Sequence, residues 1–173
     1  MSEKLNYKMQ KTGTEEQMSN REKLNNLFQN SPMPIEHLMV NLGLYMRSSV
    51  LAKTLYINEL YEKIVHLPGS IMEFGSWYGT NLALFESLRA IYDPYNYTRK
   101  VIGFDTYDGY ENLSINDGKN ELVQEGQYSI PENYIDYLKE VLDFHQKENV
   151  LPHIKKYELI KGDATKSIYE YLE

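Results

Sequence analysis

Three short apolar runs, each ending in a polar turn, organise the second half of the chain. They cover residues 70–74, 100–105 and 157–161. Between the first two runs, residues 82–92 carry apolar side chains at helical spacing, and Asp93-Pro94 ends that segment because proline cannot continue a helix. The order strand, helix, strand predicts a βαβ unit, in which two parallel buried strands are joined by a right-handed crossover.

The same periodicity predicts helices before and after this unit. Apolar residues recur at helical spacing from Ser49 to Ile64, and Pro68 and Gly69 stop that helix. Ser129 and Glu132 fit a capping box that would start a helix over residues 134–145. A last helical segment is predicted over residues 166–172, after the third strand.

The ends and the longest connection differ in composition from these segments. Residues 1–34 are polar with few apolar anchors, so we expect a mobile arm with one short helix at residues 21–28, followed by one α/β domain over residues 35–173. Residues 111–126 are rich in Asn, Asp, Gly and Glu. A connection of that length marks a lid or binding loop if it is not disordered.

Composition narrows the class of function. The chain has 173 residues, a formal net charge of −7 and Lys and Arg scattered among acids, which argues against a nucleic-acid partner and favours a small-molecule substrate. Cysteine is absent, which excludes disulfides, thiolate metal sites and a cysteine nucleophile. No signal segment and no apolar run of about 18 residues is present, so we expect a cytoplasmic protein with no membrane partner.

Candidate chemistry begins with IMEFGSWYGTN at residues 71–81. An apolar run ends in the acid Glu73 and turns through Gly75 and Gly79 into a helix. The glycines let the backbone approach a ligand, and the first turn of the helix offers unpaired N–H groups. Taken alone, the same spacing also occurs as an ordinary strand-to-helix turn.

Polar residues at the ends of the other two strands add to this signal. Ligands of parallel sheets bind at the carboxyl ends of the strands, where Asp105 follows the second run and Asp163 with Ala164 follows the third. The turn at residues 75–79 would accommodate an amino-acid moiety, and Asp105 would accept from both hydroxyls of a ribose. Asp163 would accept from an adenine amine while the amide of Ala164 donates to a ring nitrogen. Together these features predict an adenosine-bearing ligand.

Two other nucleotide classes fit less well. A nicotinamide dinucleotide site requires Gly-x-Gly-x-x-Gly, whereas here bulky Trp77 and Tyr78 stand between the glycines. The P-loop pattern Gly-x-x-x-x-Gly-Lys-Ser/Thr does not occur. S-adenosylmethionine fits the pattern better.

EFGSWYGTN, VIGFDTYDGY and ELIKGDA resemble motifs I, II and III of class I S-adenosylmethionine-dependent methyltransferases, over residues 44–173. The entry helix before PGSIMEFGSWYGT and the phrase GFDTYDGYENL resemble, more narrowly, the macrocin O-methyltransferase-like (TylF-like) family of sugar O-methyltransferases. The resemblance implies a Rossmann-like sheet and an O-methyltransferase that acts on a hydroxyl of a sugar or related small metabolite. By this resemblance, Glu73, Gly75 and Gly79 would lie by the methionine part, Asp105 by the ribose, and Asp163 and Ala164 by the adenine. Ser76 and Thr106, next to these residues, are also predicted to bind the cofactor.

Members of that family depend on Mg²⁺, with metal-binding aspartates and a catalytic base after the fourth strand. This sequence ends at Glu173, after the third strand, so we expect the catalytic residues beyond Glu173 and no metal ligands within the chain. In the sheet order 3-2-1, the first strand would have an unpaired edge. We therefore expect a truncated part of a longer methyltransferase, or a sheet completed by another chain, as in a homo-oligomer. The alternative is a non-catalytic partial Rossmann-like module that binds a nucleoside weakly or acts through protein interaction.

Overall fold

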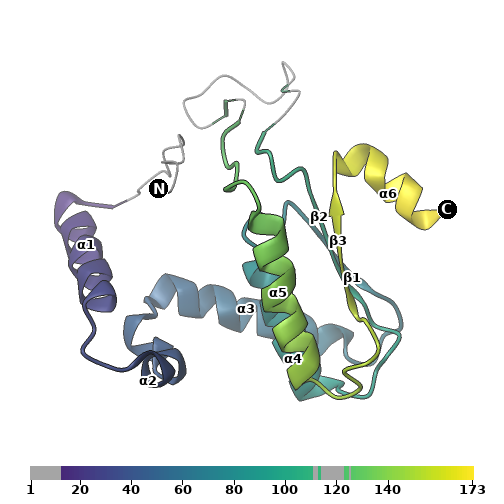
Figure 1. Ribbon diagram of the computed structural model, residues 1–173, viewed down its shortest axis with the longest axis horizontal. Coiled ribbons are helices and arrows are strands. Elements are labelled where there is room, and N and C mark those ends of the chain that lie inside the picture. The colour runs from purple at the N-terminus through teal and green to yellow at the C-terminus, as the bar shows by residue number, and fades with distance from the viewer. Residues whose placement is uncertain (1–12, 111–112, 114–122, 125) are drawn as a thin grey trace. The chain divides into compact units, whose positions relative to one another are not determined.

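The computed structural model describes residues 13–110, 113, 123–124 and 126–173 (Figure 1). The predicted binding loop at residues 111–126 therefore lies mostly outside the described residues. The chain divides into two compact units, one of Met9–Leu55 and one formed mainly by Tyr56–Glu173, which are described separately.

The unit Met9–Leu55 is helical. It holds α1 (Glu15–Gln29), α2 (Ile35–Val40), the 3-10 helix η1 (Leu42–Tyr45) and the start of α3 (Ser48–Ile64). Thr14 caps α1 through a capping box, because its hydroxyl accepts from the Gln17 N–H at 3.2 Å while the Gln17 side chain accepts from the Thr14 N–H at 3.0 Å. The helix is thus longer than the short segment that the sequence predicts, since this cap lies seven residues before the first residue of that segment, Arg21.

The second unit contains a parallel sheet of three strands. They are β1 (Ile71–Phe74), β2 (Val101–Asp105) and β3 (Tyr157–Lys161), in the order β1-β2-β3. Glu73 lies opposite Gly103, and Gly103 lies opposite Leu159. The order confirms the predicted βαβ unit and the predicted edge position of β1.

Helices cover both faces of this sheet. On one face, Leu82 of α4 (Thr80–Tyr92) packs with Leu138 and Leu142 of α5 (Tyr134–Glu148) in the main core. On the other face, Tyr171 of α6 (Ala164–Leu172) meets the ring of Phe104 edge-on at 5.8 Å. Figure 1 shows α6 across the sheet from α4 and α5. The core of the main cluster consists of Leu82, Val101, Tyr107, Leu138, Leu142 and Tyr157.

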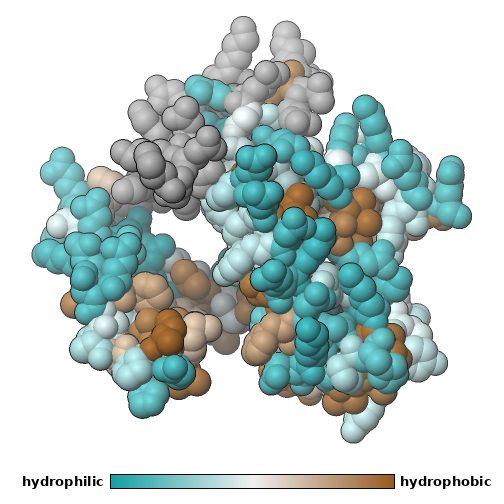
Figure 2. All heavy atoms as spheres, in the orientation of Figure 1, coloured by the Kyte–Doolittle hydropathy of each residue, from teal (hydrophilic) through white to brown (hydrophobic). Residues whose placement is uncertain are grey.

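The amphipathic pattern of α5 fits its place on the outside of the sheet. Leu138 and Leu142 are buried. Figure 2 shows mostly hydrophilic atoms over the outer surface of this helix. Burial of the apolar side drives the helix onto the sheet, and the polar side remains in contact with water.

The predicted capping box before α5 is wrong. The residue before the helix is Asn133, which has a positive φ of 68° and makes no side-chain cap. The N–H of Ser129 bonds instead to the Gly126 carbonyl at 3.2 Å, and the N–H of Ile130 bonds to the Tyr107 carbonyl at 3.4 Å. Tertiary contacts with the loop after β2 therefore fix this segment, and they override the local cap preference.

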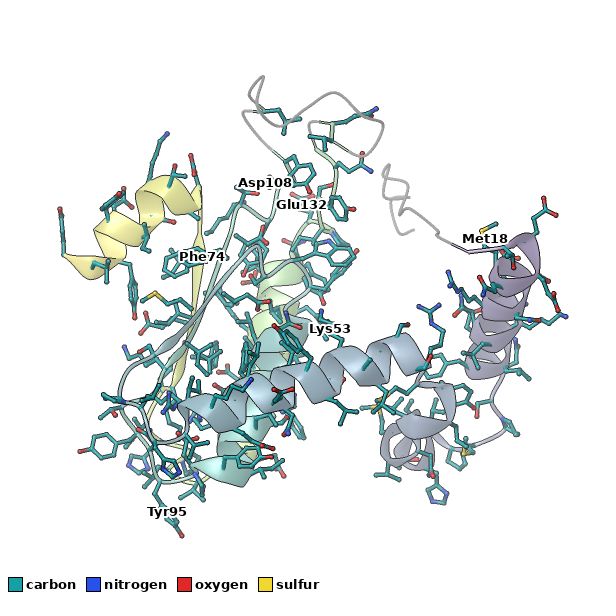
Figure 3. The ribbon with its side chains drawn as sticks, turned by 180° about the vertical axis from the view of Figure 1, so that it is seen from behind. Met18, Lys53, Phe74, Tyr95, Asp108 and Glu132 are labelled. Carbon is teal, nitrogen blue, oxygen red and sulfur yellow. The ribbon has the colours of Figure 1, made fainter. Side chains whose placement is uncertain are left out.

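A buried ionic network lies at the amino ends of the strands, opposite the candidate site. Arg99 is 2% exposed, and it donates to Asp93 Oδ2 at 2.7 Å and to the Leu67 carbonyl at 2.6 Å, which ties the end of α3 to the end of α4. Glu86 pairs with Arg89 inside the same region. These contacts fix the lower end of the sheet, where Figure 3 places Tyr95, while Asp108 lies at the other end of the strands.

None of the helices in the described part of the chain is long and apolar enough to cross a membrane.

Candidate functional site

The turn after β1 begins and ends with glycine. The Gly75 N–H donates to the Phe104 carbonyl at 2.8 Å, which extends the sheet, and the Gly79 N–H donates to the Ser76 carbonyl at 2.7 Å, which closes the turn. Gly79 has a φ of 73° and precedes the first residue of α4. A Cβ on Gly79 would stand 2.5 Å from Leu138 Cδ1, so the packing of α5 requires glycine there.

The space beside Gly75 is open. Its φ is 78°, and a Cβ at this position would have no atom within 4 Å. Gly75 also lines a cavity at this end of the sheet. Its backbone is therefore accessible to a ligand in a way that the backbone of Gly79 is not.

Asp105 ends β2, and backbone amides hold both of its carboxylate oxygens. The Trp77 N–H donates to Oδ2 at 2.7 Å, and the Tyr107 N–H donates to Oδ1 at 2.7 Å. A carboxylate oxygen has two lone pairs, so each oxygen retains one acceptor position. The amides fix the plane of the carboxylate before any ligand arrives.

Both donors have backbone angles that bulky residues rarely adopt. The φ of Trp77 is 47° and that of Tyr107 is 62°. Such conformations cost free energy and persist where the surrounding structure imposes them, often at functional sites. Here they turn two N–H groups toward one carboxylate.

Tyr107 also ties the turns after β1 and β2 together with its side chain. The ring is 3% exposed, and its hydroxyl lies 3.2 Å from the hydroxyl of Ser76, which is itself 5% exposed. Burial raises the pKa of Tyr107, so the phenol stays protonated and can donate. The contact between Ser76 and Tyr107 thus helps to fix the turn after β1.

The third wall comes from the turn after β3. The Gly162 N–H donates to the Asp105 carbonyl at 2.9 Å, which joins this turn to the end of β2. Asp163 caps α6, because its Oδ1 accepts from the Thr165 N–H at 2.9 Å and from the Thr165 hydroxyl at 2.7 Å. These hydrogen bonds lower the pKa of Asp163, so its side chain is ionised at neutral pH.

These three turns enclose a cavity of about 630 Å³. That volume is in the range of about 300–1,000 Å³ that is typical of small-molecule sites. The described residues that line it are Gly75, Trp77, Phe104, Asp105, Thr106, Gly109, Tyr110, Leu113, Tyr128, Gly162, Asp163, Ala164 and Thr165.

The base of the connection between β2 and α5 closes one side of the cavity. The Tyr110 N–H donates to the Gln127 carbonyl at 2.9 Å, and the Gly126 N–H donates to the Tyr110 carbonyl at 2.8 Å. The Thr106 hydroxyl donates to the Gly109 carbonyl at 2.8 Å. This pairing holds residues 109–110 beside residues 126–127 at the side of the cavity.

The structure brings five of the eight predicted cofactor-binding residues to the cavity, namely Gly75, Asp105, Thr106, Asp163 and Ala164. Glu73, Ser76 and Gly79 are not among the lining residues. Glu73 lies below the turn, where its Oε1 accepts from Asn81 Nδ2 at 2.5 Å.

Sequence reasoning missed the aromatic side of the cavity. Tyr110, Tyr128 and Trp77 line it together. The count of 16 tyrosines and the single tryptophan between two glycines were the available signals, but composition alone does not show which rings meet.

The described residues place no histidine at the cavity. His145 lies on α5 with its Nδ1 3.5 Å from the Ser87 hydroxyl of α4, away from the cavity lining, and burial lowers its pKa. Among the described residues, no group of three or more His, Asp or Glu side chains could hold a metal ion.

Comparisons with known proteins find similarity among solved structures only. No protein-family model matches the chain, and no curated protein matches it. Solved structures do match, and two of them each cover 94% of this chain. The first is described as CalS11, calicheamicin methyltransferase, with 34% identity and a TM-score of 0.90. The second is the apo structure of CalS11, described as a TDP-rhamnose 3′-O-methyltransferase in calicheamicin biosynthesis, with 32% identity and a TM-score of 0.78.

The chain spans 63% and 62% of the length of these two structures. The likeness extends over sequence as well as fold. This chain therefore has the fold of a class I S-adenosylmethionine-dependent methyltransferase over its three-stranded parallel sheet.

Proposed function

We propose that this chain binds S-adenosylmethionine and forms the cofactor-binding part of an O-methyltransferase that acts on a hydroxyl of a sugar or related small metabolite. The observation that carries the proposal is the carboxylate of Asp105, which two backbone amides hold at 2.7 Å between the turn at Gly75 and the turn at Asp163. A fixed carboxylate with two acceptor positions matches the two neighbouring hydroxyls of a ribose.

The rest of the cavity suits the other parts of the cofactor. The open space at Gly75 would take the methionine part, because a Cβ would fill it and glycine leaves it free. Asp163 keeps Oδ1 on Thr165, which leaves Oδ2 to accept from the adenine amine, and the amide of Ala164 would donate to the ring. Thr106 lines the cavity next to Asp105.

The proposed chemistry divides between cofactor and protein. S-adenosylmethionine supplies an electrophilic methyl group on its sulfonium. The described residues bind the adenosine, orient the methyl group and exclude water from one side, and positioning of this kind accounts for much of the rate in methyl transfer. We assign no acid–base step and no metal step to the described residues.

The acceptor class is drawn from the resemblances. The matching structures are described as a calicheamicin methyltransferase and as a TDP-rhamnose 3′-O-methyltransferase. The motif GFDTYDGYENL resembles the macrocin O-methyltransferase-like family, which also methylates sugars. Both support a sugar hydroxyl as the acceptor, and they favour an enzyme over a non-catalytic nucleoside-binding module.

Calorimetry on the 173-residue chain tests the cofactor class. We expect S-adenosylmethionine and S-adenosylhomocysteine to bind with one site each, and NAD and ATP not to bind. Transfer of a labelled methyl group to nucleotide sugars, with phenols and amines as comparison acceptors, then tests the reaction. Binding of NAD in place of S-adenosylmethionine would overturn the proposal, and methyl transfer to phenols alone would overturn its acceptor class.

A further inference from the structure

Three aromatic side chains form one continuous wall of the cavity. The ring of Tyr128 meets the ring of Trp77 edge-on with centroids 5.8 Å apart, and it meets the ring of Tyr110 at 5.4 Å. All three residues line the cavity. Because the backbone pairing described above fixes Tyr110 beside Gln127, the wall is in place without a ligand.

Trp77 is the member of this wall that lies next to the ribose position. Its own N–H donates to Asp105 Oδ2 at 2.7 Å, and Gly75 lies two residues before it. In S-adenosylmethionine the sulfonium lies between the ribose and the methionine chain. A ligand with its ribose at Asp105 and its methionine part at Gly75 therefore has its sulfonium beside Trp77.

The chemistry of an indole face suits that neighbour. Aromatic rings attract cations that lie over their faces, and tryptophan does so most strongly. S-adenosylmethionine is positively charged at sulfur, whereas S-adenosylhomocysteine, the product, is a neutral thioether. The same ring contacts both ligands, but the electrostatic part of the contact exists only for the cation.

We infer that Trp77, held by Tyr128, is a specificity-determining residue that favours the sulfonium cofactor over its neutral product. The inference rests on the proposed function and deepens it. The rings of Trp77 and Tyr128 attract the positive charge of the sulfonium. Because transfer of the methyl group removes that charge, the product binds less tightly and its release is promoted.

The test compares affinities for the two ligands by calorimetry in matched variants. Trp77→Leu removes the aromatic face but keeps a Cβ, so the backbone conformation and the N–H that holds Asp105 are retained. Trp77→Phe keeps a weaker aromatic face. Tyr95→Leu is the control, because Tyr95 is 74% exposed at the opposite end of the strands (Figure 3).

We expect Trp77→Leu to weaken binding of S-adenosylmethionine about tenfold more than binding of S-adenosylhomocysteine, which is the effect of a partly desolvated cation–π contact. Trp77→Phe should lie between wild type and Trp77→Leu, and Tyr95→Leu should match wild type. An analogue with a protonated amine in place of the sulfonium should follow S-adenosylmethionine through the series.

The outcomes separate this inference from the proposed function. Equal weakening of both ligands in Trp77→Leu would overturn the inference and leave cofactor binding intact, because the ring would then contribute only apolar contact. Failure of the wild-type chain to bind either ligand would overturn the proposed function itself. Circular dichroism and thermal unfolding of each variant show that a loss of affinity does not come from loss of the fold.

Discussion

The backbone N–H of Trp77 donates to Oδ2 of Asp105 at 2.7 Å, across 28 positions of sequence. This bond joins the turn after β1 to the end of β2 and fixes the carboxylate that the proposed ribose site requires. The Tyr107 N–H completes the arrangement at Oδ1. The candidate site is therefore organised before a ligand binds, which lowers the free-energy cost of ordering on binding.

Replacing Asp105 tests this arrangement directly. Asp105→Asn keeps the shape of the side chain, but it removes the charge and replaces one acceptor oxygen with an amide donor that faces a backbone N–H. Hydrogen bonds to charged groups contribute about 1.5–3 kcal/mol, so we expect affinity for S-adenosylmethionine to fall by roughly 10- to 100-fold. Calorimetry measures the change.

The matched control is Asp108→Asn, three residues further on. Asp108 forms an ion pair of 2.8 Å with Lys161, and both side chains are more than half exposed. Exposed pairs contribute little, so this variant should bind as wild type does. Equal losses in the two variants would mean that general charge, and not the fixed carboxylate, sets the affinity.

The buried pair of Ser76 and Tyr107 should contribute to stability. Tyr107→Phe leaves the Ser76 hydroxyl buried without its partner, and Ser76→Ala does the same to Tyr107. Each should lower the free energy of unfolding by about 1–2 kcal/mol. A double-mutant cycle in urea should give a coupling energy of about 1 kcal/mol, and additive effects would show that the two hydroxyls do not interact.

The two glycines of the first turn should separate stability from binding. Both have positive φ, so an alanine at either position meets similar backbone strain. Gly79→Ala also places a methyl group 2.5 Å from Leu138 Cδ1, and should destabilise the fold more than Gly75→Ala does. Gly75→Ala fills open space in the cavity and should weaken cofactor binding.

Urea unfolding and calorimetry on the same two proteins distinguish these effects. A larger loss of stability in Gly75→Ala than in Gly79→Ala would contradict the packing account. Unchanged cofactor affinity in Gly75→Ala would contradict the placement of the ligand.

Glu86 should make stability depend on pH. Burial raises the pKa of Glu86 from 4.5 to about 7, against the opposing effect of Arg89. A group that holds its proton more tightly in the folded state stabilises fully below pH 4.5, and that stabilisation is lost as the pH rises through about 7. At ~1.36 kcal/mol per pKa unit, the loss is about 3 kcal/mol.

Glu86→Gln cannot titrate, so it should lack this loss. We expect the difference in unfolding free energy between wild type and Glu86→Gln to change in favour of the variant between pH 5 and pH 8. Glu59→Gln, which alters an exposed pair with Lys63, should track wild type at every pH. A change in favour of wild type would mean that Arg89 dominates and lowers the pKa of Glu86.

The sequence predicts the parts of the fold that depend on local pattern. The strands at β2 and β3, the crossover helix and the strand order follow from apolar runs and from the break at Asp93-Pro94. The place of Asp105 at the cavity follows as well, because parallel strands present their carboxyl ends at one edge of the sheet.

The sequence does not predict the parts that depend on tertiary contact. The Trp77 amide reaches Asp105 only because a bulky residue takes a positive φ, which its residue type disfavours. Ser76 has the position of a ligand-binding residue in the motif, but its hydroxyl contacts the hydroxyl of the buried Tyr107. The aromatic wall of the cavity depends on the backbone pairing between Tyr110 and residues 126–127, which lie far apart along a long connection.

Trp77 is the only tryptophan of the chain, so its fluorescence reports on the candidate site without labelling. Titration of the wild-type chain with S-adenosylmethionine, with NAD as the comparison ligand, tests the central claim most directly. We predict a saturable change in Trp77 emission with S-adenosylmethionine and none with NAD. No saturable change with S-adenosylmethionine, or an equal change with NAD, would contradict the account.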